Sequence, residues 1–303
     1  MRGSLLMPTP MTMTSSVDQS INHVIPQADG GYYEARFVRR VNDYFICYLS
    51  SHTGCSKACR FCHLTTTGQT MMRPSSYDDY MEQARLVFDD YRQALSRPGA
   101  VRAARVHFNF MARGEPLENP CLTAPKEFSR LHASLVELSN EFGLEAKFKI
   151  SSIMPEGYKG EVDDFTALQG VQLYYSLYSL DPSFRKRWLP RAMPPERALD
   201  MIAESQKLTG SILVLHQAFI KNENDSFNDV DAIVDAVNKR GIRARFNLVR
   251  YNPAAPKYGC EPEEEKLEAL FERMSNRLTG GGRGKIVPRV GPDVYASCGM
   301  FVP

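Results

Sequence analysis

The sequence of 303 residues has no apolar run approaching the roughly 20 residues of a membrane-spanning helix. It does not open with the charged-then-apolar pattern of a signal peptide. Neither sign of charge prevails, because 37 Lys and Arg stand against 35 Asp and Glu, for a net charge of +2. This balance implies neither strong attraction to nucleic acid nor exclusion of it. The seven cysteines are an odd number in a long chain, unlike a small secreted disulfide framework.

The composition suits one large domain with a sizeable core, since 43% of the residues are hydrophobic and 24% are charged. Residues 1–29 lack periodicity and are rich in Ser, Thr, Pro and Met, so we expect a flexible N-terminal arm. Residues 30–303 would then form the domain. It opens with two extended runs, Tyr32–Val41 and Tyr44–Ser50, whose alternation and aromatic content predict a β-hairpin.

Short apolar strands and amphipathic helices alternate through the rest of the chain, after a first helix that begins at Pro74-Ser75-Ser76. The expected strands are Ala104–Phe110, Ala146–Ile150, Val171–Leu177, Ser211–Phe219, Ile242–Val249 and Lys285–Val290, and the expected helices lie near 124–142, 194–208, 228–240 and 262–278. This order predicts an α/β fold, a partial (β/α)6 barrel preceded by the short hairpin. Active sites of such folds lie at the carboxyl ends of the strands.

The strongest motif is the C-x3-C-x2-C run formed by Cys55, Cys59 and Cys62. Three thiolates this close in sequence can hold a 4Fe-4S cluster and leave its fourth iron without a protein ligand. An open iron can bind the amino and carboxylate groups of S-adenosylmethionine (SAM), which is the ligand that uses this spacing. The alternatives are a zinc knuckle or a loop of ordinary thiols. Structural zinc takes four ligands, usually as two separated pairs, and His63 is badly placed to complete such a set. The spacing therefore predicts a radical SAM enzyme, and a cluster-binding protein is expected in the reducing cytoplasm.

A second motif, Gly114-Glu115-Pro116, directly follows a predicted strand. A glycine that lets the backbone approach closely, followed by a carboxylate, suits the ammonium group of a methionine. Alone, the same three residues are typical of an ordinary turn.

Five motifs in this order make the chain resemble the RlmN/Cfr family of radical SAM RNA methyltransferases. The resemblance runs from the hairpin to the C-terminus. The matching segments are SSHTGCSKACRFC, FMARGEPLENP, YYSLYSLDPSFRKRWLP, NLVRYNPAAPKYG and ASCGMF.

What this resemblance implies is a reaction with two SAM molecules. The first SAM methylates Cys298, and the second is cleaved at the cluster to a 5′-deoxyadenosyl radical that removes hydrogen from that methyl group. The carbon radical then adds to an sp2 carbon of an adenine, in rRNA or tRNA, and a second cysteine releases the product by disulfide formation and proton removal. The resemblance also implies an electron donor such as flavodoxin or ferredoxin, and a monomer.

The resemblance assigns roles by position. The cluster cysteines would be Cys55, Cys59 and Cys62, and Cys298 would carry the methyl group. The SAM site would be lined by Gly114, Glu115, Ser151, Ser176, Leu177, Tyr178 and Asn252. The alternative for Ser176 and Asn252 is strand-end capping.

The chain departs from the family pattern at three places. The accessory N-terminal RNA-binding domain has no counterpart in this sequence, and Tyr178 stands where the family has a histidine. A gap-free match puts Tyr48 at the position of the second cysteine, with Cys47 beside it. A slip of one residue turns a strand side chain to the opposite face, although a bulge restores it. We predict Cys47 as the second catalytic cysteine, with a buried strand cysteine as the alternative.

The basic run Arg185-Lys186-Arg187, with Arg191 and Arg197, is either solvated surface or a phosphate contact beside an extruded base. Two other functions stay open. The missing RNA-binding domain suggests a radical SAM enzyme of the same scaffold that acts on a protein or small molecule. The other alternative is a catalytically silent iron–sulfur or RNA-binding protein.

Overall fold

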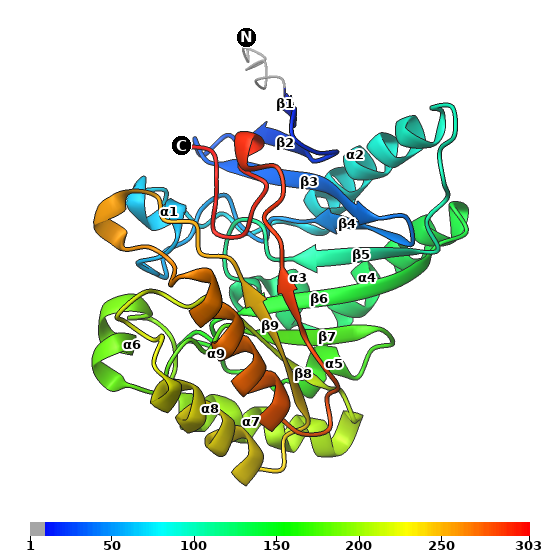
Figure 1. The fold of residues 1–303 in the computed structure, drawn as a ribbon. Coiled ribbons are helices and arrows are strands. Elements are labelled where there is room, and N and C mark those ends of the chain that lie inside the picture. The colour runs from blue at the N-terminus through cyan, green and yellow to red at the C-terminus, as the bar shows by residue number, and fades with distance from the viewer. Residues whose placement is uncertain (1–9) are drawn as a thin grey trace.

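The computed structural model describes residues 10–303, which form one sheet of ten strands in chain order. The first four strands are β1 (Met11–Thr14), β2 (Ile21–Pro26), β3 (Tyr32–Val41) and β4 (Tyr44–Tyr48), and they pair antiparallel. The predicted hairpin is confirmed as β3 and β4. It leads directly into the cysteine loop (Figure 1).

The predicted arm is wrong for residues 10–29, because β1 and β2 extend the sheet from β3. Buried polar contacts hold them there: Asn22 Nδ2 donates to Glu34 Oε2 at 2.8 Å, and His23 Nε2 lies 2.7 Å from Asp90 Oδ2. Such contacts leave no apolar periodicity in the sequence. Residues 1–9 of the expected arm lie outside the described residues.

Strands β4 to β10 run parallel, as the alternation of strands and helices predicts. The later strands are β5 (Arg105–Phe110), β6 (Glu145–Ser152), β7 (Val171–Tyr175), β8 (Leu213–Gln217), β9 (Ala244–Val249) and β10 (Lys285–Val287). Because β1 and β10 are the two edges of the sheet, the barrel stays open. The predicted partial barrel is confirmed.

Helices cover the outer face of this sheet (Figure 1). The long ones are α2 (Tyr77–Leu95), α4 (Pro125–Glu141), α7 (Pro195–Thr209), α8 (Phe227–Lys239) and α9 (Glu264–Arg277), and the short ones are α1 (His63–Thr66), α3 (Pro120–Thr123), α5 (Asp163–Thr166) and α6 (Pro182–Trp188). Three 3-10 turns lie at Pro116–Glu118, Pro256–Tyr258 and Pro292–Val294. Within the described part of the chain, no helix has the length and apolarity needed to cross a membrane.

The two faces of the strands differ in chemistry, because successive side chains of a strand point to opposite faces. Outward-facing Phe45, Phe108 and Phe148 are fully buried in the core against the helices. The Phe108 and Phe148 rings stack at 5.2 Å between centroids. Inward-facing positions of the same strands carry His107 and Lys149. The barrel interior therefore carries polar and charged side chains as well as apolar ones such as Ile46 and Val249.

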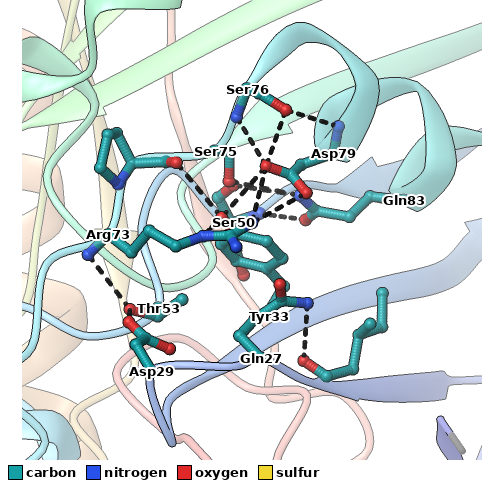
Figure 2. Close-up of polar contacts among 12 residues, drawn as sticks. Gln27, Asp29, Tyr33, Ser50, Thr53, Arg73, Ser75, Ser76, Asp79 and Gln83 are labelled. Carbon is teal, nitrogen blue, oxygen red and sulfur yellow. Dashed lines mark hydrogen bonds and ion pairs between the residues drawn. The ribbon is translucent and has the colours of Figure 1, made fainter. Parts of the chain in front are cut away.

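The loop between β4 and α2, which carries the three clustered cysteines, is held at both ends (Figure 2). Ser50 N donates to Gln83 Oε1 at 2.7 Å, and Ser75 Oγ donates to Ser50 O at 2.7 Å. Arg73 pairs with Asp79 in the first turn of α2 at 3.0 Å. These contacts fix where the loop leaves β4 and where it returns.

Candidate active site

A cavity of about 780 Å³, part of it open to solvent, lies at the carboxyl ends of the strands. It gathers residues from distant parts of the sequence, and we call it the cysteine cavity. Its lining includes nine of the predicted site residues, Cys55, Cys59, Cys62, Gly114, Glu115, Ser151, Ser176, Tyr178 and Cys298. Leu177 is fully buried outside it, and Asn252 lines a neighbouring cavity.

The three clustered thiols are free and enclosed. Burial raises the pKa of Cys62 to about 11, and it also raises the pKa values of Cys55 and Cys59. Thiolates in this place need a group that supplies positive charge, as iron does. Within residues 10–303, no three His, Cys, Asp or Glu side chains gather around a single metal ion. Three thiols that line one cavity are the donor chemistry that a 4Fe-4S cluster requires, and Cys55, Cys59 and Cys62 would hold it.

Gly114 forms part of the cavity wall with φ of +97°. A Cβ at this position would lie 2.5 Å from Ser51 Oγ and 2.7 Å from His52 N. Only glycine fits both the space and the conformation. The backbone of the Gly-Glu-Pro motif is therefore packed tightly against the start of the cysteine loop.

Glu115 is a buried carboxylate that faces neutral donors. Ser152 Oγ donates to its Oε1 at 2.6 Å, and Leu117 N donates at 3.1 Å. Burial raises the pKa of Glu115 to about 7. An ammonium group in the cavity would offset the cost of burying the ionised Glu115 carboxylate. Ser152 is a site residue that the sequence analysis missed, although it is the second serine of the pair that contains Ser151.

Tyr178, at the family's histidine position, stacks on Phe61 with 4.4 Å between ring centroids. Its backbone N donates to Gln217 Oε1 at 2.6 Å, and its φ is +63°. Burial raises the pKa of the phenol well above its usual value, so Tyr178 stays neutral. The stacked pair forms an aromatic wall beside Cys62.

The segment that contains Cys298 is anchored over the cavity by its main chain. Asn252 Nδ2 donates to Cys298 O at 3.0 Å, and Arg289 Nε donates to Asn252 Oδ1 at 2.8 Å. His63 N, one residue after the cysteine loop's last thiol, donates to Gly299 O at 3.2 Å. Asn252, expected in the SAM site, thus holds the Cys298 backbone.

A buried ion network, which the sequence analysis missed, fixes the residues after Cys298. Glu34 pairs with Arg36 at 2.7 Å and with Arg113 at 2.8 Å. Burial alone would raise the pKa of Glu34, but the two guanidinium groups outweigh it and hold the pKa below its usual range. Arg36 Nη2 donates to Met300 O at 2.7 Å, and Glu34 Oε1 accepts from Val302 N at 3.1 Å. The C-terminal residues therefore lie beside β3, as Figure 1 shows.

The structure does not bring Cys47 to this site. Cys47 is fully buried in the core on the outer face of β4, whereas its neighbours Ile46 and Tyr48 line the barrel interior. The β3–β4 register is regular at Cys47, because the only irregularity in it lies between Val38 and Val41. No bulge therefore turns Cys47 inward, and its position matches the alternative of a buried strand cysteine. All seven cysteines are free.

Of the basic run at and after α6, only Arg185 is buried, and the other basic residues lie on the surface. Arg185 is buried, and its guanidinium donates to three main-chain carbonyls. Arg187 pairs with Glu223, and Arg191 pairs with Glu156 at 3.0 Å. These contacts give the run a structural role in addition to any surface role.

Comparison with known proteins gives consistent relatives, although no family model matches the chain. It is 26% identical to the dual-specificity RNA methyltransferase RlmN of Sulfurovum sp. over 277 residues, which cover 90% of this chain and 70% of that protein. Identity to RlmN of Wolinella succinogenes is 27% over 262 residues, covering 85% and 66%. Identity to RlmN of Helicobacter hepaticus is 23% over 308 residues, covering 96% and 77%. The chain thus spans about two thirds to three quarters of the length of these relatives.

Solved structures share the fold. A radical SAM methyltransferase from Sphaerobacter thermophilus matches with a TM-score of 0.78 at 20% identity, over 96% of this chain and 80% of that one. Streptococcus suis SuiB bound to S-adenosylmethionine matches with a TM-score of 0.56 at 14% identity, over 84% and 52%.

The partial barrel, with its C-x3-C-x2-C loop at the carboxyl ends of the strands, defines a radical SAM enzyme. Within this class the matched relatives support an RlmN-like family. Over most of its length the chain is similar to RlmN proteins, and it shares the fold of a solved radical SAM methyltransferase.

Proposed function

We propose that this protein binds a 4Fe-4S cluster and SAM and methylates an sp2 carbon of an adenine in RNA through a methyl-cysteine intermediate. The observation that carries the proposal is the meeting of Cys298 with the three clustered cysteines and Glu115 in one cavity. RNA enters the proposal from the relatives, which are named as RNA methyltransferases.

In this proposal Cys55, Cys59 and Cys62 hold the cluster. When bound, the cluster supplies the electron that cleaves SAM. Glu115 binds the ammonium group of SAM, because its buried carboxylate lacks a cationic partner among the residues that contact it. The remaining SAM contacts come from Gly114, Ser151, Ser176 and Tyr178, with Ser152 orienting Glu115. Leu177 and Asn252, which the resemblance also assigns to SAM, lie outside this lining and would support it from behind.

Cys298 is the methyl acceptor in the first half of the reaction. Its thiolate attacks the methyl carbon of SAM, the new C–S bond forms, and S-adenosylhomocysteine leaves with the electron pair of the broken bond. Cys298 lines the cavity, and although burial raises the pKa of its thiol, the charges of Arg36 and Arg40 oppose that rise and favour the thiolate. Asn252 keeps the Cys298 main chain in place while the sulfur first faces SAM and then the adenine of the RNA.

Apart from the three clustered cysteines, which the proposal assigns to the cluster, no cysteine of residues 10–303 shares a cavity with Cys298, since Cys47 faces the core. Tyr48 stands on the inner face instead. We propose that the proton removal assigned to a second cysteine in the family falls to another group here. We also propose that the protein works as a monomer in the cytoplasm with flavodoxin or ferredoxin as electron donor, which suits its seven free cysteines.

Reconstituted enzyme, incubated anaerobically with SAM, a reductant and total cellular RNA, tests the proposal. We expect 5′-deoxyadenosine in solution and a methylated adenosine among the digested nucleosides by mass spectrometry. SAM cleavage without any new methyl group on RNA would overturn the RNA assignment while leaving the radical chemistry. Absence of 5′-deoxyadenosine would overturn the proposal as a whole.

A further inference from the structure

The loop that leads into Cys298 is closed on itself. Ser297 Oγ donates to Val290 O at 2.8 Å and accepts from Val290 N at 2.9 Å, which joins the two ends of residues 290–297. Inside the loop, Gly291 O accepts from two main-chain N–H groups, at 3.1 Å and 2.9 Å. We call residues 290–297 the acceptor loop. Because the loop is internally bonded, a contact at its outer end also restrains Cys298, which follows it directly.

The outer end of the acceptor loop lies beside the turn that joins β1 to β2 (Figure 1). We call this turn, residues 15–20, the clamp turn. Asp293 of the loop accepts three hydrogen bonds from it, from Ser15 Oγ at 2.7 Å, from Ser16 N at 2.8 Å and from Ser16 Oγ at 3.0 Å. These hydrogen bonds lower the pKa of Asp293, so its carboxylate is ionised at neutral pH and the contact is charge-assisted.

The clamp turn returns this contact with an aspartate of its own. Asp18 Oδ2 accepts from Gly291 N at 2.8 Å. Burial alone would raise the pKa of Asp18, but hydrogen bonds from Ser20 and Gly291 outweigh it and lower the pKa. The two segments therefore exchange carboxylates, and each aspartate accepts hydrogen bonds from the opposite segment.

Close packing accompanies these hydrogen bonds. Gly291 has φ of +45°, and an added Cβ would lie 2.7 Å from the Cβ of Ser20. The acceptor loop also joins a small buried apolar cluster formed by Val38, Ile46, Val290, Val294 and Ala296. Apolar contacts are non-directional, so the orientation of the loop depends on its hydrogen bonds.

Among the described residues, the hydrogen bonds that join the acceptor loop to a distant part of the chain all go to residues 15–22. The last of them comes from Asn22 Nδ2, which donates to Val294 O at 3.0 Å and to Glu34 Oε2 at 2.8 Å. Glu34 in turn accepts from Val302 N at 3.1 Å. The strands β1 and β2 and their turn thus hold the chain before Cys298 and connect it with the chain after it.

We propose that the clamp turn positions Cys298 for methyl transfer, with Asp18 and Asp293 as positioning residues. This rests on the proposed function, in which the sulfur of Cys298 receives a methyl group and then presents it to the base. Neither aspartate lines the cysteine cavity, so neither is placed to contact SAM or the cluster. Loss of the clamp should therefore impair delivery of the methyl group and leave cleavage of SAM intact.

Hydrogen–deuterium exchange and product analysis of the reconstituted holoenzyme test this role. Asp293→Ala removes three hydrogen bonds between the acceptor loop and the clamp turn. The amides of the acceptor loop should exchange about tenfold faster through local opening, while those of the cysteine loop keep their rate. Methyl transfer to RNA should fall by about tenfold because the sulfur is misplaced. With 5′-deoxyadenosine formation unchanged, the ratio of 5′-deoxyadenosine to methylated product should rise.

Three further variants separate positioning from a general loss of stability. Asp18→Ala breaks the same contact from the side of the clamp turn and should also raise the product ratio. Asp293→Asn keeps a side-chain oxygen that can accept from Ser15, and it should recover part of the wild-type ratio. Asp231→Ala is the control, because it removes an aspartate that pairs with Arg273 in the helical layer, and it should change neither measurement.

Unchanged exchange of the acceptor loop in both Asp293→Ala and Asp18→Ala would overturn the inference, as would a constant product ratio in both variants. Either result, with normal methylation by the wild type, contradicts only the role of the clamp turn. Absence of methylated RNA from the wild type contradicts the proposed function on which that role rests.

Discussion

The cysteine cavity and a second cavity inside the barrel, which we call the barrel cavity, differ in electrostatic character. The residues that line the barrel cavity include Tyr48, Lys149, His216 and Lys285. In the cysteine cavity burial raises pKa values, that of Glu115 to about 7 and that of Cys62 to about 11. In the barrel cavity burial and repulsion lower them, that of Lys149 to about 7. The barrel cavity has no Asp or Glu in its lining, whereas the cysteine cavity has both Glu115 and Lys57, and Lys57 is paired with Glu118. The two cavities therefore differ in charge balance, and Cys298 lines both.

The largest effect is expected from removing the sulfur of Cys298, the residue that lines both cavities. Cys298→Ala should reduce methyl transfer to background, because alanine has no sulfur to accept the methyl group. 5′-Deoxyadenosine formation should persist, because the cluster cysteines are intact. Cys260→Ala, an exposed cysteine outside both cavities, should methylate at the wild-type rate. Methyl transfer by the Cys298→Ala variant would contradict the proposal of a methyl-cysteine intermediate.

Damage to the cysteine cavity alone should follow from Gly114→Ala. The new Cβ would meet Ser51 Oγ and His52 N in a backbone conformation that alanine adopts poorly. We expect a loss of about 2–4 kcal/mol in the free energy of unfolding by urea, through strain and overpacking together, and weaker SAM binding. Gly143→Ala is the matched control, because it has a positive φ but nothing within 4 Å of the added atom. It should cost only about 1 kcal/mol; equal losses would show that the contact at Gly114 is unimportant.

A smaller effect is expected when the Cys298 sulfur is kept but the main chain of Cys298 loses its hydrogen bond to Asn252. Asn252→Ala deletes the hydrogen bond to Cys298 O and leaves the sulfur present. We expect the rate of methyl transfer to fall by about 10²-fold, which a misplacement of the order of 1 Å can cause. SAM cleavage should fall much less, so the ratio of 5′-deoxyadenosine to methylated product should rise. A constant ratio would mean that Asn252 acts on SAM and not on Cys298.

The smallest effect concerns the pH dependence of stability in the barrel cavity. Lys149 has its pKa lowered from 10.5 to about 7, by burial and by Lys285, Arg40 and Arg245. Between these values the unfolded chain binds more protons, so this group makes the folded state more stable as pH rises above 7, by about 1 kcal/mol per pH unit. Urea unfolding of wild type and Lys149→Met at pH 6.5 and 8.5 should show this slope in the wild type alone. A variant that keeps the slope would place its origin elsewhere.

The sequence predicted the features that depend on neighbouring residues. The helix after Ser76, the β3–β4 hairpin and the order of strands and helices are all confirmed. The residues of the cysteine loop and of Gly114-Glu115 come together as their motifs suggest. Spacing along the chain determines such features, so one sequence suffices.

The contacts that the sequence did not predict join residues that are far apart. Glu34 and Arg113 are 79 residues apart, and their ion pair depends on how β3 lies against the loop after β5. Cys47 shows the same limit on a smaller scale. Its direction depended on whether a bulge lies beside it, and the bulge lies further along the β3–β4 hairpin. The barrel cavity also requires seven parallel strands to be in register before its cations can be seen as neighbours.

The anchoring of the C-terminal residues by β3 has a consequence for the order of folding. The hydrogen bond from Arg36 to Met300 O joins residues 264 positions apart. Contacts of such separation form late, because the entropy of closing the loop must be lost before the contact stabilises anything. During synthesis the barrel strands and the cysteine loop emerge well before the segment that carries Cys298. The half of the site that handles SAM can therefore assemble first, and the methyl acceptor joins it only when the two ends of the barrel domain meet.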